Sequence, residues 1–134
     1  MLPLSPRLRI ALATAEAMAT DQQRRNVTCS DIMCGITSLT GGVADNLLKA
    51  RGFSCPVPAV SLENLNHESK GYSVESLQAL SAAMLEAASR SHTLVGVEDM
   101  LIGILSPRSN EISRIFIEKN INVEELLSEV RKQI

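Results

Sequence analysis

Few side chains in this sequence have both the chemistry and the spacing of a reactive site. The three cysteines, Cys29, Cys34 and Cys55, match the spacing of neither a CxxC pair nor a zinc knuckle. The two histidines, His67 and His92, lie far apart along the chain, and no nucleophile stands in a recognisable frame with a base. We therefore expect free thiols in a reducing compartment, no metal or other cofactor, and no enzymatic activity.

The sequence also lacks a nucleotide-binding signature. A phosphate-binding loop needs glycines at a fixed spacing, followed by lysine and a hydroxyl residue. The stretch "GGVADNLLK" has neither that spacing nor the terminal hydroxyl. ATP hydrolysis by that mechanism is not expected.

The remaining candidates are carboxylates in a phrase that the sequence contains twice. "VTCSDIMCGIT" begins at Val27 and "VGVEDMLIGIL" begins at Val95, 68 residues later. Each phrase places an acidic residue, Asp31 or Asp99, just ahead of an apolar run. A carboxylate in the first turn of a helix is stabilised by the helix dipole, typically by about 0.3–1 kcal/mol. Both aspartates are therefore predicted to mark the start of a short, enclosed helix.

The same 68-residue offset extends beyond this phrase. It aligns Ser5 with Ser73 and continues without a gap to Gly52 and Asn120. A constant register over about fifty residues indicates an internal duplication. We predict one domain over 1–134 that consists of two repeats, at about 5–54 and 73–134, joined by a linker at about 55–72 with a short helical turn near 62–66.

Each repeat has the pattern of successive helices. Ser5 followed by proline is a typical helix start, and Ser73 is its counterpart. Asn122 and Glu125 have the spacing of a capping box for the last helix. The predicted architecture is all-α, a pseudo-twofold duplicated four-helix repeat with seven to eight helices, because the first copy has no clear counterpart of the last one. The other expected helices cover 31–38, 43–51, 98–105 and 111–119.

Composition excludes two classes of partner. Hydrophobic residues make up 45% of the chain but aromatic residues only 2%, and the net charge is −2 with both signs interspersed. A nucleic-acid-binding protein would need a basic surface or aromatic side chains that stack on bases. No stretch approaches the roughly 18 consecutive apolar residues of a membrane span. We therefore expect neither nucleic acid nor a membrane as partner.

The N-terminal segment imitates an export signal. "PRLRIALATAEAMAT" combines early arginines, an apolar run and an Ala-Met-Ala sequence. However, Glu16 interrupts the apolar run, and the same pattern returns at 77–87, where no signal peptide can lie. We therefore expect a cytoplasmic protein.

Three segments together resemble the N-terminal repeat domain of Clp unfoldases, most closely the ClpC and ClpA type. They are "VGVEDMLIGIL", "EISRIFIEKNINVEELLSEVRKQ" and "VTCSDIMCGITSLTGGVADNLLKARGF", and the resemblance covers essentially the whole chain. It implies a non-catalytic docking module that captures protein substrates or adaptor proteins for an AAA+ ATPase ring. A free-standing regulator, which binds a Clp assembly or competes for its adaptors, is the alternative. Domains of this type are expected to be monomeric in isolation.

The resemblance also implies a ligand. In ClpC-type domains, the glutamate of the repeated phrase is associated with phosphorylated arginine, and Glu98 occupies that position. A carboxylate can bind the guanidinium group while helix-start amides and a cation hold the phosphate. Ser73 would offer a hydroxyl at the neighbouring helix start. In the first copy, the serine at the helix start is Ser5, and Arg7 is the cation.

Neither copy has the full family pattern. Glu75 stands where the family commonly has arginine, and Ser30 replaces the glutamate of the first copy. A carboxylate at position 75 would repel a phosphate by about 1 kcal/mol or more if it is partly buried. Two interpretations of Glu98 and of the two serines therefore remain: peptide or phosphoarginine binding, and plain stabilisation of helix starts.

Overall fold

The computed structural model describes residues 2–53, 71–106 and 111–133. Within these ranges the chain forms seven helices and two strands of two residues each, which confirms the all-α prediction. The predicted linker at 55–72 lies outside the described residues except for its last two, which form a strand. The helical turn expected near 62–66 also lies outside them.

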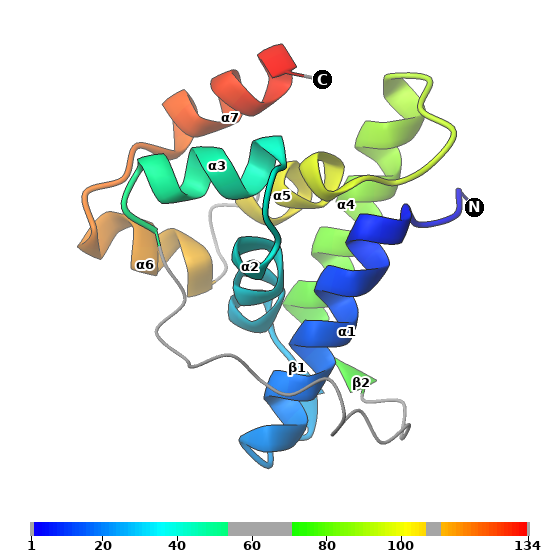
Figure 1. Ribbon diagram of the computed structural model, residues 1–134, viewed down its shortest axis with the longest axis vertical. Coiled ribbons are helices and arrows are strands. Elements are labelled where there is room, and N and C mark those ends of the chain that lie inside the picture. Colours follow the sequence, from blue (N-terminus) through cyan, green and yellow to red (C-terminus); the bar gives the residue numbers. More distant parts are fainter. Residues whose placement is uncertain (1, 54–70, 107–110, 134) are drawn as a thin grey trace.

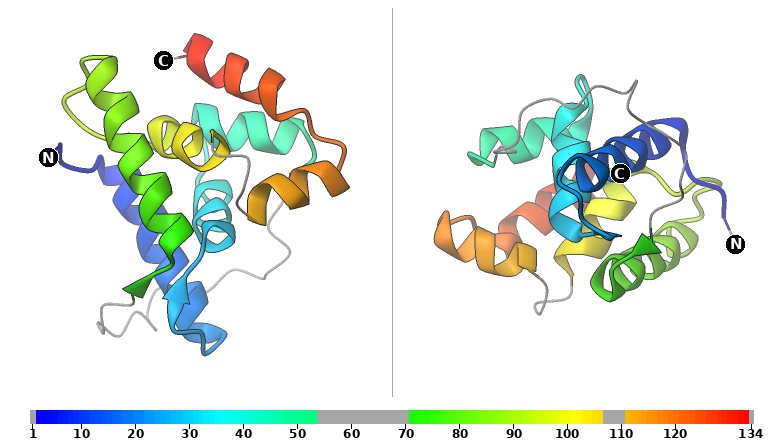
Figure 2. Two further views of the ribbon diagram at one scale, coloured as in Figure 1. Left: turned by 180° about the vertical axis from the view of Figure 1, so that it is seen from behind. Right: turned by 90° about the horizontal axis from the view of Figure 1, so that it is seen from below.

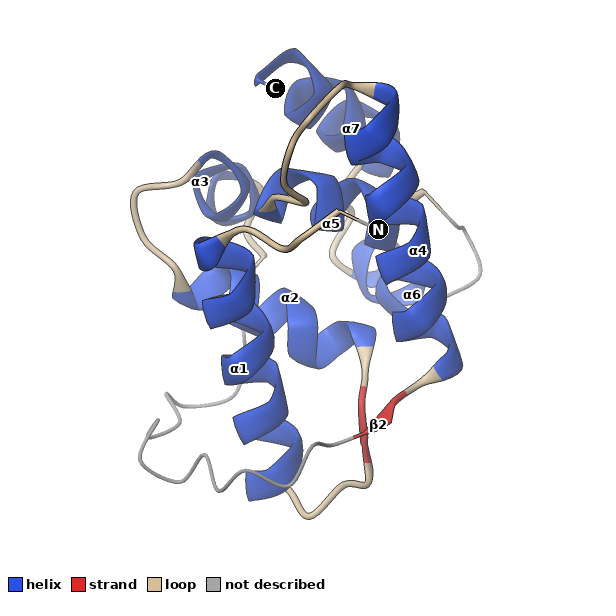
Figure 3. Cartoon of the chain, turned by 90° about the vertical axis from the view of Figure 1, so that its right-hand side faces the viewer, coloured by secondary structure: helices blue, strands red, loops and turns tan. Residues whose placement is uncertain are grey.

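The two long helices stand on either side of a pair of short ones. Helices α1 and α4 flank α2 and α5, while α3 and α7 lie across one end of the molecule (Figures 1 and 3). The two strands lie at the opposite end, and α6 packs beside α2 and α5 (Figure 2). The elements are α1 (Pro6–Asp21), β1 (Asn26–Val27), α2 (Cys29–Ser38), α3 (Val43–Ala50), β2 (Gly71–Tyr72), α4 (Val74–Ser89), α5 (Val97–Leu105), α6 (Glu111–Glu118) and α7 (Val123–Gln133).

The short helices α2 and α5 form the centre of the core. Nearly all their side chains are buried, and their largest contacts are with α1 and α4 respectively. A Cβ atom added at Gly35 would overlap the carbonyl oxygen of Ala11, and one added at Gly103 would overlap that of Ala79. Each short helix therefore crosses its long neighbour at a distance that only glycine allows.

The helix ends repeat between the halves in detail. Gln23 and Ser91, 68 residues apart, follow α1 and α4 with φ angles of 57° and 58°. Gly52 and Asn120, at the same offset, follow α3 and α6 with φ angles of 82° and 57°. Glycine and asparagine tolerate this left-handed conformation best among the residues. Both halves therefore end their helices in the same way.

The halves are joined by an exchange of extended segments. Strand β1 pairs in parallel with β2, with Val27 opposite Tyr72. The corresponding pair at the 68-residue offset is Leu4 and Val95, which form an isolated parallel bridge. The segment that precedes each long helix thus pairs with the segment that precedes the short helix of the other half. This pairing was not predicted, because segments of two residues leave no periodic pattern in a sequence.

Helix α7 ties the second half to the first. Arg51, which follows α3, pairs with Glu125 at 3.0 Å and also with Glu129, both on α7. Nearby, the ring of Phe53 packs against that of Phe116 on α6, with 5.4 Å between the ring centroids. The last helix therefore closes over the end of the first repeat.

Candidate functional site

The long helices begin with the predicted serine caps. Ser5 Oγ accepts a hydrogen bond from the amide of Leu8 at 3.1 Å. Ser73 Oγ accepts one from the amide of Ser76, also at 3.1 Å. Both serines therefore satisfy one of the amides that a helix start leaves unpaired, which confirms their structural role.

The short helices begin with buried aspartates. Asp31 accepts a hydrogen bond from the amide of Thr28 at 2.9 Å, and Asp99 accepts one from Gly96 at 3.0 Å. Both helices begin slightly before the predicted positions, because Thr28 and Gly96 are the cap residues. The aspartates are nearly inaccessible to solvent, so they are structural residues and cannot contact a partner.

A basic residue stands beside each buried aspartate at the 68-residue offset. Arg24 forms a two-pronged ion pair with Asp31, in which Nη1 lies 2.7 Å from Oδ2. His92 Nδ1 lies 3.1 Å from Asp99 Oδ2. The histidine therefore stabilises the turn before α5.

The starts of α1 and α5 lie side by side. The amide of Ser5 donates to the carbonyl of Val95 at 2.8 Å, and the amide of Val95 donates to the carbonyl of Pro3 at 2.8 Å. Glu98 lies in the first turn of α5 and is half-buried. We call this place, defined by Ser5, Val95 and Glu98, the α1–α5 seam.

A second seam joins the starts of α4 and α2. The amide of Ser73 donates to the carbonyl of Val27 at 2.9 Å, and the Oγ of Ser76 donates to the same carbonyl at 2.8 Å. Ser30 lies in the first turn of α2. The structure therefore corrects the expected grouping of Ser73 with Glu98: each long helix start meets the short helix of the other half.

Arg7 contacts the segment before α3 and the first turn of α3 itself. Its Nη1 donates to the carbonyl of Thr40 at 3.2 Å, and its Nη2 lies 3.5 Å from Asp45. The side chain remains 46% exposed. Arg7, the cation expected for the first copy, thus lies on the first turn of α1 and contacts both the segment before α3 and Asp45 in the first turn of α3.

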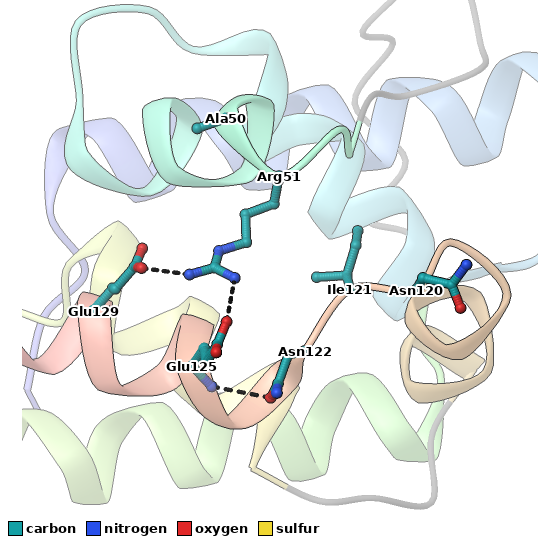
Figure 4. Close-up of a pocket in the computed structure, with 7 residues that line it drawn as sticks. All are labelled: Ala50, Arg51, Asn120, Ile121, Asn122, Glu125 and Glu129. Carbon is teal, nitrogen blue, oxygen red and sulfur yellow. Dashed lines mark hydrogen bonds and ion pairs between the residues drawn. The ribbon is translucent and has the colours of Figure 1, made fainter.

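The structure also contains an open groove beside the end of α3. Its volume is about 420 Å³, and it is lined by Ala50, Arg51, Asn120, Ile121, Asn122, Glu125 and Glu129. Figure 4 shows the Arg51 guanidinium between the two carboxylates of α7. The cation of the groove is therefore neutralised from within, and the groove has no free positive group to offer an anion. Asn122 Oδ1 caps α7, as predicted, by accepting from the amide of Glu125 at 3.2 Å.

The cysteines differ from the sequence prediction. Cys29 is a free thiol and is buried, but Cys34 is disulfide-bonded. The expectation that all three cysteines are free thiols is therefore wrong. Its basis was spacing along the chain, which carries no information on which segments meet in space.

Among residues 2–53, 71–106 and 111–133, histidine, cysteine and acidic side chains form no cluster that could hold a metal ion. In the same part of the chain, no helix has the length and the apolar character needed to cross a membrane.

The fold is that of the N-terminal domains of Clp and Hsp100 chaperones. The N-terminal domain of the caseinolytic protease associated chaperone ClpD from Arabidopsis thaliana is similar, with a TM-score of 0.70 and 12% identity over 97% of this chain and 93% of that one. The N-terminal domain of Hsp104 from Candida albicans has a TM-score of 0.75 and 14% identity over 96% of this chain and 89% of that one. At these identities the likeness concerns the fold.

The family is identified by the sequence and not only by the fold. Residues 3–119 match the model of the Clp repeat N-terminal domain, and the chain belongs to this family. The family is one of non-catalytic domains of AAA+ chaperones. No curated protein matches the sequence.

Proposed function

We propose that this chain is a non-catalytic docking module, which recruits protein substrates or adaptor proteins to an ATP-dependent Clp unfoldase or protease. Its family membership supports this role. The observation that carries the proposal is the α1–α5 seam, where the hydrogen bond from Ser5 to Val95 brings two helix starts together. Glu98 stands at this seam with a partly accessible carboxylate.

The chemistry of the seam suits a ligand with adjacent positive and negative groups. Glu98 can accept hydrogen bonds from a guanidinium group, and a two-pronged pair of this kind is among the strongest in proteins. The positive ends of the two helix dipoles favour a phosphate. Arg7, on the first turn of α1, is 46% exposed although it lies 3.5 Å from Asp45, and its guanidinium can add a positive charge that Asp45 partly offsets. Phosphorylated arginine combines both groups in one side chain.

The second seam is a poorer candidate for the same ligand. Ser73 supplies the hydroxyl there, but Ser30 cannot bind a guanidinium group as a carboxylate does. Glu75, which is exposed in the first turn of α4, would repel the phosphate. We therefore assign the ligand to Ser5, Arg7 and Glu98, and leave Ser73 as a helix cap.

Calorimetric titration with a phosphoarginine peptide tests this assignment. Glu98→Ala should weaken binding about tenfold or more, because a charge-assisted pair contributes about 1.5–3 kcal/mol and 1.4 kcal/mol corresponds to a factor of ten. Glu75→Ala is the matched control: it also removes a first-turn glutamate, but at the other seam, and should leave the affinity unchanged. The same peptide with unmodified arginine should bind more weakly than the phosphorylated one.

Three results would contradict the assignment. Binding that survives Glu98→Ala would remove Glu98 from the site. An affinity that rises in Glu75→Ala would move the ligand to the second seam. Equal binding of the two peptides would eliminate the phosphate contact and leave docking of adaptor proteins as the role of the domain.

A further inference from the structure

Arg7, the cation proposed for the phosphate, shares one buried carboxylate with a lysine. Its Nη2 lies 3.5 Å from Asp45 Oδ1, and Lys49 Nζ lies 3.9 Å from Asp45 Oδ2. The aspartate side chain is 2% exposed, whereas the arginine and lysine side chains are 46% and 48% exposed. We call Arg7, Asp45 and Lys49 the α3 charge cluster, because the aspartate lies in the first turn of α3. The cluster carries one net positive charge.

The contact between Arg7 and Asp45 is loose for a buried carboxylate. An arginine that is fully paired with a carboxylate donates at about 2.7–2.9 Å, as Arg24 does in its two-pronged pair with Asp31, at 2.7 Å. The separation of 3.5 Å in the cluster is longer than that. The Nη1 of Arg7 donates instead to the carbonyl of Thr40 at 3.2 Å. The guanidinium is therefore held near the carboxylate without a close hydrogen bond to it.

Lys49 gives Asp45 a second cation. Its Nζ donates to the carbonyl of Leu39 at 3.4 Å, which keeps the ammonium group near Asp45 Oδ2. That oxygen is buried and accepts no hydrogen bond from the described residues. A carboxylate that is buried beside a single cation binds it strongly, because an unpaired buried charge is costly. Lys49 therefore competes with Arg7 for the aspartate.

Gly42 leaves the arginine room to close onto the aspartate. A Cβ atom added at this glycine would lie 2.5 Å from Arg7 Nη2 and 2.6 Å from Asp45 Oδ1. The amide of Gly42 donates to the same carboxylate oxygen at 3.0 Å. Because glycine places no side chain between the guanidinium and the carboxylate, the competing lysine is what keeps them apart.

The second half has no counterpart of the cluster. At the 68-residue offset, the equivalent residues are Glu75, Ser113 and Ile117. The serine caps of the long helices and the aspartates of the short helices, by contrast, are present in both halves. The cluster is therefore not part of the framework that the two halves share. Through Arg7 it belongs to the first turn of α1, where the α1–α5 seam lies.

We propose that Lys49 is a positioning residue for the ligand of the α1–α5 seam. By sharing the charge of Asp45, it keeps the Arg7 guanidinium from closing onto that carboxylate and leaves it available to the phosphate. Lys49 acts through Asp45 and need not contact the ligand. This inference rests on the proposed function and adds to it the residue that sets the strength of the phosphate contact.

Calorimetric titration of the intact chain with the phosphoarginine peptide tests this role. Lys49→Met should weaken binding about threefold or more, because Arg7 then closes onto Asp45 and part of a charge-assisted contact is lost. Lys49→Arg keeps the positive charge and should bind at least as tightly as the wild type. Lys119→Met is the matched control: it removes the same charge from just beyond α6, over the ring of Phe53, and should leave the affinity nearly unchanged.

A double-mutant cycle tests whether Lys49 acts through Asp45. Asp45→Asn keeps an oxygen that can cap α3 but removes the charge for which the two cations compete. In this background, Lys49→Met should weaken binding no more than Lys119→Met does. Circular dichroism establishes that each variant is folded. A full Lys49→Met loss in the Asp45→Asn background would show that the lysine attracts the phosphate directly, and would contradict the positioning role.

Failure of this inference and failure of the proposed function give different results. A wild-type chain that does not bind the peptide, or a Glu98→Ala variant that binds it as tightly as the wild type, would refute both. If Glu98→Ala weakens binding but Lys49→Met has no larger effect than Lys119→Met, the docking function stands and the role of Lys49 is refuted. A Lys49→Arg variant that binds as weakly as Lys49→Met would refute that role as well, because the charge would then not be what matters.

Discussion

At the scale of single residues, the two halves place different basic side chains beside the same buried, helix-capping aspartate. Asp31 and Asp99 cap equivalent helices, but Arg24 binds both oxygens of Asp31, while His92 contacts one oxygen of Asp99. Within the described residues, Asp99 Oδ1 is buried and has no hydrogen-bond partner. A buried oxygen without a partner costs stability. The second copy therefore retains the cap but lacks the full ion pair of the first.

The ionisation of the Tyr72 hydroxyl tests whether this side chain is buried in solution. Its hydroxyl donates to Glu16 at 3.0 Å, and burial raises its pKa above the ordinary value, with the negative charge of Glu16 as a further cause. Because Tyr72 is the only tyrosine and the chain has no tryptophan, the ultraviolet absorbance of tyrosinate reports on this group alone. We expect ionisation in the folded protein well above the pH of about 10 at which an unfolded tyrosine ionises.

The sign of the effect on stability follows from the same shift. Above pH of about 10, the unfolded chain loses the tyrosine proton and the folded chain keeps it, so the free energy of unfolding falls as the pH rises. Glu16→Gln should bring the ionisation of Tyr72 back towards its ordinary pH, because it removes the neighbouring charge. A native tyrosine that titrates near pH 10 would contradict the buried environment.

At the scale of the elements, the crossing of a short helix over a long one depends on a single missing side chain. Gly103→Ala and Gly35→Ala should each destabilise the protein by about 3 kcal/mol or more, because the new methyl group overlaps a backbone carbonyl and overpacking of this kind forces backbone shifts. Helix propensity predicts the opposite sign, a gain of about 0.8–1 kcal/mol. Urea denaturation measures the difference.

A control separates the crossing from general effects of substitution. Ser128→Ala places alanine at an exposed position of α7 and should change the free energy of unfolding by less than about 0.5 kcal/mol. A stabilising effect of either glycine substitution would show that the helices can move apart at little cost, and would contradict the close crossing.

At the scale of the whole molecule, neither half is complete without the other. The pairings of Leu4 with Val95 and of Val27 with Tyr72 both run between the halves. Separate fragments of residues 1–53 and 71–134 should therefore be mostly unfolded, because each loses a partner for its extended segment and a large part of its core. An equimolar mixture should regain helical circular dichroism. A fragment that alone unfolds cooperatively would refute this interdependence.

The helices could be predicted from the sequence because their determinants are local. The Ser5-Pro6 start, the first-turn aspartates and the left-handed residues at 52 and 120 act within a few residues of the chain. The ion pair of Arg51 with Glu125 joins residues 74 positions apart and leaves no such local pattern. For the same reason the disulfide at Cys34 and the two strands were not predicted.

The candidate site was only partly predictable. The sequence identified Ser5, Arg7, Ser73 and Glu98 as residues at helix starts, and the structure places them there. It could not show which helix starts meet, because two copies of one pattern can pack within or between halves. The hydrogen bond from Ser5 to Val95 decides in favour of packing between halves.

The exchange of extended segments has a consequence for the origin of the molecule. Before duplication, a protein with one repeat would have had one extended segment before its long helix and one before its short helix. In a symmetric dimer of this protein, the first segment of each copy could have paired with the second segment of the other copy across a twofold axis. Gene fusion would then have fixed this domain-swapped ancestor as one chain. The two seams would since have been free to diverge, which accounts for a carboxylate at residue 98 and a hydroxyl at residue 30.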